Sequence, residues 1–114
     1  MAACLFCEIV AGRAPGSLVY RDAEVTAFRD VRPQAPTHIL VVPNEHFASL
    51  AEVGEEQGAL LGQMVAIANR LAVQEGIARS GYRLVINNGP DAGQSVGHLH
   101  LHLLGGRAFR WPPG

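Results

Sequence analysis

Three histidines alternate with leucines near the end of the chain, at His98, His100 and His102. Because successive side chains on a β-strand point to opposite faces, the histidines would share one face and the leucines the other. Imidazoles spaced about 6.6–7 Å apart along one strand are costly to bury without polar partners. The pattern therefore predicts a strand over residues 98–104 whose leucine face packs on the core and whose histidine face lines a polar site.

Three interpretations of this histidine face are open. The rings could be solvated surface residues, although three of the five histidines in the chain fall at a strict period of two. They could bind a metal ion, because imidazole is a common ligand. They could also act at an acyl or phosphoryl centre, with one imidazole as nucleophile or base and the others as hydrogen-bond donors.

The turn before the histidines favours phosphoryl chemistry. Gly93, Gln94 and Ser95 form a flexible segment with a hydroxyl group and consecutive backbone N–H groups. Such N–H groups can form a nest that binds an anion. An oxyanion held against an imidazole suits phosphoryl transfer, because positioning and charge stabilisation do most of the work there.

A second set of reactive side chains lies at the other end of the chain. Cys4 and Cys7 have the spacing with which two thiolates bind one zinc ion. The pair could instead be buried free thiols or a redox Cys-x-x-Cys motif. No βαβ pattern surrounds it, which speaks against the redox interpretation.

The elements that must position these residues follow from hydrophobic periodicity and turn residues. Apolar residues predict a short helix over 5–10, while a stripe of period 3.6 predicts a long helix over 55–75. Ser49 and Glu52 have the spacing of a capping box, which predicts a helical turn there. Strands are expected over residues 18–21, 25–29, 38–42, 82–87 and 98–104.

These elements predict an α+β fold with a five-stranded, mainly antiparallel sheet, one long helix and a short N-terminal helix. The long helix falls between the third and fourth strands. So small a sheet has edge strands, and an edge strand can pair with a second chain. A dimer is therefore expected.

Composition narrows the class of protein. The chain of 114 residues is long enough for one domain, and its net charge of −1 gives no general attraction to nucleic acid or acidic membranes. No apolar run approaches the about 18–20 residues that span a bilayer. The N-terminus lacks the basic region of a signal peptide, so we expect a cytoplasmic protein.

The histidine segment resembles the histidine-triad (HIT) motif, His-x-His-x-His followed by apolar residues. The resemblance covers nearly the whole chain and points to the Hint branch of this superfamily. It implies a single HIT domain over residues 1–114, a homodimer whose sheet continues across the subunits, and a hydrolase of nucleotide conjugates. The further segments that carry it are Asp30–His38, Tyr82–Asn87, Gly93–Ser95 and Gly105–Gly114.

The resemblance also implies chemical roles. His100 would be the nucleophile that attacks the α-phosphate of a purine nucleoside 5′-phosphate conjugate, and water would resolve the nucleotidyl-histidine. His102 and the backbone around Gln94 and Ser95 would hold the phosphate oxygens. Ser95 and His38 would help deliver a proton to the departing amine. No cofactor is expected for this chemistry.

Nucleotide binding would involve further residues by the same resemblance. Asp30 would accept hydrogen bonds from the ribose, Asn87 would bind near the phosphate, and Gly93 would begin the turn that holds it. Trp111 would reach the site from the partner subunit. The expected substrates are adenosine or guanosine 5′-phosphoramidates and related aminoacyl nucleotides. The apolar slot for the base would consist of Leu5, Phe6, Ile9, Phe28, Val31 and Leu40.

Some relatives in the wider superfamily bind zinc through two cysteines and two histidines. By resemblance the ligands here would be Cys4, Cys7, His46 and His98. Four protein ligands make a closed structural site, which would leave His100 free for chemistry.

Two other functions remain open from the sequence. The chain could be a nucleotide- or partner-binding module with incidental turnover, or a metal-dependent hydrolase that uses all three triad histidines as ligands. Simpler structural roles also exist, because Asp30 could form an Asx-turn and Trp111 could belong to an exposed tail.

Two positions depart from the Hint pattern. Arg29 stands where many Hint proteins have a histidine, and Ala14 stands where a larger apolar residue is usual. Both are expected to border the base pocket, so the sequence leaves the base preference open.

Overall fold

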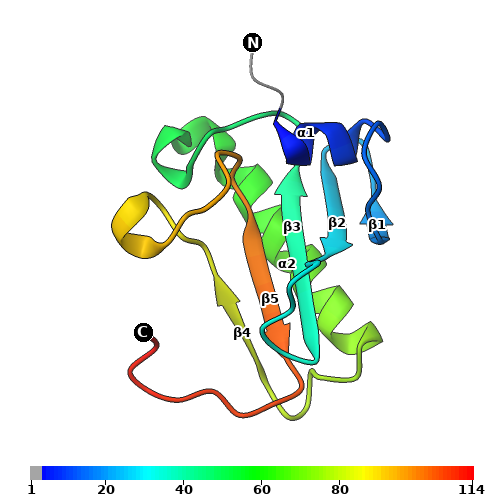
Figure 1. Cartoon of the computed structure of the whole chain (residues 1–114), viewed down its shortest axis with the longest axis vertical. Coiled ribbons are helices and arrows are strands. Elements are labelled where there is room, and N and C mark those ends of the chain that lie inside the picture. Colours follow the sequence, from blue (N-terminus) through cyan, green and yellow to red (C-terminus); the bar gives the residue numbers. More distant parts are fainter. Residues whose placement is uncertain (1–3) are drawn as a thin grey trace.

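The computed structural model describes residues 4–114 and contains one five-stranded sheet with a helix on each side (Figure 1). Two connecting segments of this part of the chain contain short 3-10 helices, at Leu50–Glu52, Glu55–Gln57 and Pro90–Ala92. The strands are β1 (Leu18–Arg21), β2 (Val25–Arg29), β3 (Thr37–Pro43), β4 (Tyr82–Val85) and β5 (Leu101–Gly105). The α-helices are α1 (Leu5–Val10) and α2 (Gly58–Gln74).

The strands follow the order β1-β2-β3-β5-β4, and each neighbouring pair is antiparallel. Helix α2 connects β3 to β4 and crosses one face of the sheet (Figure 1). The expected α+β architecture is therefore confirmed. Strands β1 and β4 form the edges, and continuation of the sheet into a second subunit remains a prediction.

The main core lies between α2 and this face of the sheet. The helical stripe predicted from the sequence buries Met64, Ile67 and Leu71 against Ile39 and Val41 of β3. The three leucines that alternate with the histidines complete this core, and none of them exposes more than 2% of its surface. Burial of these apolar side chains is the main source of the fold's stability. They are Leu99, Leu101 and Leu103.

A smaller core lies on the opposite face of the sheet. Phe6 and Ile9 of α1 pack against Phe28 of β2 and against Leu40 and Val42 of β3. Odd and even positions of β3 thus serve different cores, because side chains alternate across a strand. This second core forms the floor on which the candidate site is built.

Most element boundaries match the expectations within two residues, and β4 ends two residues earlier than predicted. Ser49 does precede a helical turn, Leu50–Glu52, but its side chain makes no capping hydrogen bond. Glu52 instead accepts from the backbone N–H of Ala48. No helix within residues 4–114 is long and apolar enough to cross a membrane.

The predicted strand over residues 98–104 is wrong at its beginning, because β5 starts only at Leu101. The N–H of Leu99 donates to the carbonyl of Phe47 at 2.7 Å. The ring of His100 donates from Nδ1 to the carbonyl of His98, also at 2.7 Å. These backbone groups are therefore not available to a β-ladder. His98 and His100 lie in an irregular segment before the strand, with His98 in a bend, and only His102 lies on the strand.

Candidate active site and metal centre

A cavity of about 180 Å³ opens on the face of the sheet that carries α1. Helix α1 supplies one wall, the end of β2 supplies another, and the triad forms the polar end. Val31 is 91% exposed and Leu5 57% exposed, so the mouth is apolar and open to solvent. Ten residues expected from the sequence line it, namely Leu5, Phe6, Ile9, Phe28, Asp30, Val31, Leu40, Ser95, His100 and His102.

His100 has a fixed orientation and a defined tautomer. Its Nδ1 lies 2.7 Å from the carbonyl oxygen of His98, which can only accept a hydrogen bond. The Nδ1 atom must therefore carry the hydrogen, and in the neutral ring Nε2 keeps its lone pair. Phe6 holds the ring edge-on, with centroids 5.2 Å apart and planes at 90°. This is the arrangement that a nucleophilic imidazole requires.

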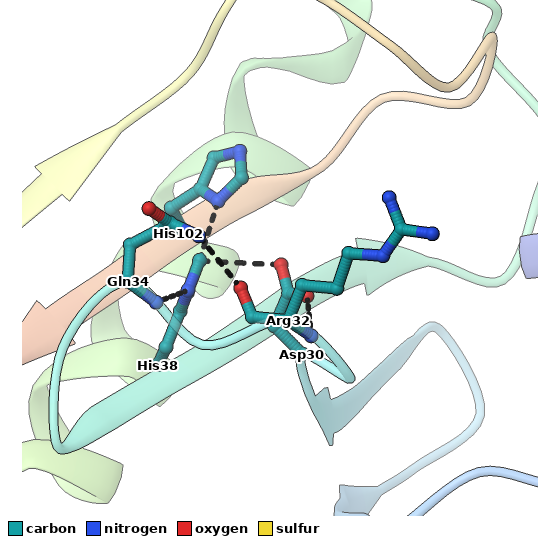
Figure 2. A network of polar contacts seen from close by, with 5 residues as sticks. All are labelled: Asp30, Arg32, Gln34, His38 and His102. Atoms are coloured by element: carbon teal, nitrogen blue, oxygen red, sulfur yellow. Dashed lines mark hydrogen bonds and ion pairs between the residues drawn. The ribbon is translucent and has the colours of Figure 1, made fainter.

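His102 is oriented by a chain of hydrogen bonds that starts at the backbone (Figure 2). The N–H of Gln34 donates to Nδ1 of His38 at 3.0 Å, so the hydrogen of a neutral His38 ring lies on Nε2. Nε2 of His38 lies 2.8 Å from Nδ1 of His102 and donates to it. The hydrogen of His102 therefore lies on Nε2. Through these two hydrogen bonds the backbone amide of Gln34 sets the tautomers of His38 and His102.

The Nε2 atom of His102 is buried and has no hydrogen-bond partner among residues 4–114. An unpaired buried donor is costly unless a ligand satisfies it. Burial, with smaller effects from His100 and His38, lowers the pKa of His102 to about 4. The ring is thus neutral near pH 7 and presents an N–H donor, which suits a phosphate oxygen.

His38 does not face the cavity in the way expected of a proton donor to the leaving group. It is 5% exposed, and both ring nitrogens are engaged, one by Gln34 and the other by His102. Burial lowers the pKa of His38, while the nearby carboxylate of Asp30 raises it. These contacts place His38 behind His102 as the residue that orients it, and its direct role in proton delivery stays a prediction.

Asp30 forms the Asx-turn that the sequence left open, and it also lines the cavity. Its Oδ1 accepts from the N–H of Arg32 at 2.8 Å, which is the Asx-turn (Figure 2). Its Oδ2 lies 3.4 Å from Nε2 of His38. Asp30 also lines the cavity beside Val31, and its contact with a ribose remains a prediction.

The turn before the triad differs from the expected phosphate nest. The N–H of Gly93 donates to Pro90, and that of Gln94 donates to Gly89, so neither amide is free for a ligand. The side chain of Gln94 stabilises the loop by donating to the carbonyls of Ala48 and Val96. The roles expected for these two amides are therefore wrong.

Donors are nevertheless available one residue further along the turn. Ser95 and Val96 line the cavity, and the recorded hydrogen bonds within residues 4–114 leave their amides unused. A phosphate can therefore meet N–H groups from this loop, one from Ser95 as expected and one from Val96, which the sequence did not indicate.

Two expected nucleotide-binding residues lie outside the cavity. Asn87 lines a separate groove together with His38 and His102, on the side of the triad away from the base slot. Trp111 is 82% exposed and does not line the cavity of its own subunit. Its expected contact with the partner's site would form only in a dimer and remains a prediction.

The two departures from the Hint pattern affect the cavity less than expected. Arg29 reaches the rim, but its guanidinium binds both carboxylate oxygens of Glu75 at the end of α2, at 2.8 and 3.0 Å. This pairing raises the pKa of Arg29 and lowers that of Glu75. Ala14 packs on the small core and does not line the cavity, so the expectation for Ala14 is wrong.

A second cluster of reactive side chains lies next to the triad, with ligand atoms within 4.8 Å of one another: Cys4, Cys7, His46 and His98. Tetrahedral zinc with Zn–S of about 2.3 Å and Zn–N of about 2.0–2.1 Å holds its ligand atoms about 3.3–3.8 Å apart. The separations from His98 Nδ1 are 3.4 Å to Cys4 Sγ, 3.5 Å to Cys7 Sγ and 3.1 Å to His46 Nδ1. The cluster therefore fits a zinc ion.

The tautomer of His98 supports this fit. Its Nε2 donates to the carbonyl of Pro43 at 2.9 Å, which leaves Nδ1 as a lone pair directed at the cysteines. Burial lowers the pKa of His98, and the neutral ring is the form that binds metal. A backbone carbonyl behind a metal-binding histidine is the usual way in which its ring is oriented.

A second group, Asp30, His38 and His102, also brings three ligand atoms together. It does not fit a metal ion, because the Gln34 amide places a hydrogen on Nε2 of His38, the atom that would have to bind. His100 belongs to neither group within residues 4–114. The geometry thus speaks against a catalytic metal held by the three triad histidines together.

Several functional contacts were missed by sequence reasoning. The Gln34 amide orients His38 and the Pro43 carbonyl orients His98. Both are backbone groups, so the residue types at these positions do not predict the contacts. Gly16 lines the cavity, and a Cβ there would lie 2.7 Å from Ile9. A Pro-Gly pair is typical of an ordinary turn, so the sequence does not predict that Gly16 lies close to Ile9.

The lowered pKa of His102 predicts a pH-dependent stability. Unfolding returns the ring to a pKa of about 6.5, so the unfolded chain binds a proton that the folded chain does not. The free energy of unfolding should therefore fall as the pH drops from about 6.5 towards about 4, by about 1 kcal/mol per pH unit for this group. Urea unfolding of the wild type and of His102→Asn, measured at several pH values, isolates the contribution. Equal slopes for the two proteins would contradict the assignment.

Comparisons with known proteins agree with this geometry. The HIT domain family model matches residues 11–109. The purine nucleoside phosphoramidase of Escherichia coli K12 is 48% identical over 103 residues, which are 90% of this chain and 87% of that protein. The 14 kDa zinc-binding protein of Zea mays is 47% identical over 112 residues, 96% of this chain and 87% of that protein.

Solved structures show the same relationship. The crystal structure of a HIT family hydrolase from Legionella pneumophila superposes with a TM-score of 0.96 at 48% identity, covering 98% of this chain and 100% of that one. The chain therefore belongs to the HIT family, and its relatives place it among the Hint-like nucleotide hydrolases.

Proposed function

We propose that this chain is a purine nucleoside phosphoramidase that works through a covalent nucleotide on His100. The observation that carries the proposal is the pair of opposite tautomers, with a lone pair on Nε2 of His100 and a hydrogen on Nε2 of His102. A nucleophile and a phosphate donor thus lie on adjacent rings, whose centroids are 4.9 Å apart. The phosphoramidase of Escherichia coli supports the reaction class.

In the first step Nε2 of His100 attacks the α-phosphorus, and the bond from phosphorus to the leaving nitrogen breaks. The amine takes a proton from the hydroxyl of Ser95, and Ser95 regains a proton from solvent. The base would lie in the apolar slot between α1 and β2, and the carboxylate of Asp30 would accept from the ribose. The product of this step is a nucleotidyl-histidine.

In the second step a water molecule attacks the same phosphorus. The bond from phosphorus to Nε2 breaks, His100 recovers its lone pair, and the water proton leaves to solvent. The Nε2–H of His102 and the amides of Ser95 and Val96 would hold the phosphate oxygens in both steps. His38 acts as a positioning residue, because it keeps the hydrogen of His102 on the cavity side.

Replacement of the nucleophile tests the proposal. His100→Asn should reduce kcat for a purine nucleoside 5′-phosphoramidate by at least about 10³-fold, because the first step is lost. Binding of AMP or GMP, measured by calorimetry, should remain and serves as the control for folding. Intact mass after quenching in base should show a nucleotide adduct on the wild type and none on the variant.

Turnover by His100→Asn near the wild-type rate would reject the nucleophile and favour a binding module with incidental activity. Activity that disappears in chelator and returns with added metal, while the fold stays intact, would favour a metal-dependent hydrolase.

We also propose that Cys4, Cys7, His46 and His98 hold a structural zinc ion. The four ligand atoms and the tautomer of His98 support it, and the Zea mays relative is named for zinc binding. Zinc here would join α1 to the loop that carries the triad. No step of the reaction passes through this ion.

Metal content tests the zinc proposal. Wild-type protein equilibrated with zinc and desalted should retain about one ion per chain, whereas Cys4→Ser should retain much less. Zinc at 100 times its Kd should stabilise the wild type by about 2.7 kcal/mol, seen as a higher Tm, and should not stabilise the variant to this extent. A wild type that retains no zinc and gains no stability from it would exclude the site.

Finally, we propose that residues 1–114 act as one HIT domain in a cytoplasmic homodimer. The unpaired edge of β4 and the exposed ring of Trp111 support an interface between copies of the chain. The two free cysteines are consistent with a reducing compartment. Sedimentation equilibrium should give about twice the chain mass, and Trp111→Ala should raise KM if this ring completes a partner's site. A monomer at micromolar concentration would reject the dimer.

A further inference from the structure

Helix α1 has few polar contacts with the rest of the molecule, and within residues 4–114 they run through its two cysteines. Cys4 caps the helix and lies 3.4 Å from His98, while Cys7 in the first turn lies 3.2 Å from His46 and 3.5 Å from His98. The other recorded hydrogen bonds of residues 4–10 reach no further along the chain than Ala14. Contacts to sulfur are weak hydrogen bonds.

The helix also depends on its surroundings for its own stability. It has six residues, which is too few for a helix to be stable by itself in water. Its position therefore rests on the cysteine contacts and on the apolar side chains that pack on the small core, Phe6, Ile9 and Val10. A ligand that bonds to both cysteines and to the histidines behind them would fix the helix more firmly than these contacts do.

The same helix forms a wall of the cavity in which the base is proposed to lie. Leu5, Phe6 and Ile9 line this cavity, so a purine there would contact the helix directly. The cysteine cluster and the cavity thus share one short, weakly attached element. Two ligands that order the same element favour each other's binding, because the second ligand finds the element already ordered.

Phe6 is the side chain that reaches from one site to the other. It lies between the two cysteines in the sequence and is 5% exposed. Its ring centroid is 6.0 Å from that of His98 and 5.2 Å from that of His100, in both cases edge-on. It is also 5.2 Å from the ring of Phe28, another wall of the cavity. One ring therefore contacts a member of the cluster, the proposed nucleophile and the base slot.

We propose that Phe6 is a positioning residue that couples the cysteine cluster to the nucleotide site, so that zinc on the cluster and a purine nucleotide in the cavity strengthen each other's binding. This inference rests on the proposed zinc and nucleotide sites and adds a regulatory link between them. The link is reciprocal: the factor by which zinc lowers the Kd of AMP equals the factor by which AMP lowers the Kd of zinc. Phe6 takes part in no bond making or breaking.

Two pairs of binding constants on the wild type test the proposal. The Kd of AMP, measured by calorimetry, should be about 5- to 20-fold lower for zinc-loaded protein than for protein stripped with chelator and desalted. The Kd of zinc, measured by competition with a chromophoric chelator, should fall by the same factor when AMP is saturating. Chelator with AMP and no protein is the blank for weak binding of zinc by the phosphate. Neither measurement requires turnover.

Phe6→Leu and Val31→Ala separate coupling from binding. Phe6→Leu keeps an apolar slot wall but loses the ring that contacts His98 and His100, so the coupling factor should fall to about 2 or less. Val31 lines the same cavity from the loop after β2 and is 91% exposed. Val31→Ala should weaken AMP binding equally with and without zinc and keep the wild-type factor.

Equal affinity of the wild type for AMP in the two metal states overturns the inference and leaves both proposed sites standing. This comparison decides the matter even where a variant fails to fold. A coupling factor that Phe6→Leu retains in full rejects the role of Phe6. A wild type that binds no zinc rejects the zinc site, one that binds no AMP rejects the nucleotide site, and either result rejects the inference with it.

Discussion

The hydrogen bond from Nδ1 of His100 to the carbonyl of His98 is the constraint on which the site depends. It forms at a carbonyl outside the β-ladder, because β5 begins only at Leu101. It also places the lone pair of the ring on Nε2, the atom that can reach a phosphorus. A regular strand through residue 98 would leave the carbonyl in the sheet and the tautomer undetermined. The break in the strand is thus part of the chemistry.

Each triad ring obtains its state from a different backbone group. The Pro43 carbonyl leaves His98 with a lone pair on Nδ1, the His98 carbonyl leaves His100 with one on Nε2, and the Gln34 amide acts on His102 through His38. Three identical side chains are thereby suited to three different roles, the proposed metal ligand, nucleophile and phosphate donor. Burial keeps the pKa of His98 and of His102 low, so both rings stay neutral and these assignments hold near pH 7.

The sequence predicts the strands, the helices and the residues that meet at the cavity, because periodicity records which face of an element is buried. It does not predict which donors are used. Of the nest expected at Gly93, Gln94 and Ser95, the first two amides are taken by the carbonyls of Pro90 and Gly89, so only that of Ser95 is left for a ligand. Nor does it predict that both ring nitrogens of His38 are engaged, one by the Gln34 amide and the other by His102. Such backbone contacts depend on three-dimensional placement and have no residue signature.

The cysteine cluster and the catalytic cavity are linked by shared elements. Cys4 and Cys7 belong to the first turns of α1, and the same helix supplies Phe6, which lies edge-on against His100. His98 supplies a ring to the cluster and a carbonyl to His100. Any ligand that fixes the cluster therefore fixes both the wall of the base slot and the nucleophile. Because the ligand atoms of the cluster do not include any atom of His100 or His102, a metal held there would act on the proposed reaction through positioning alone.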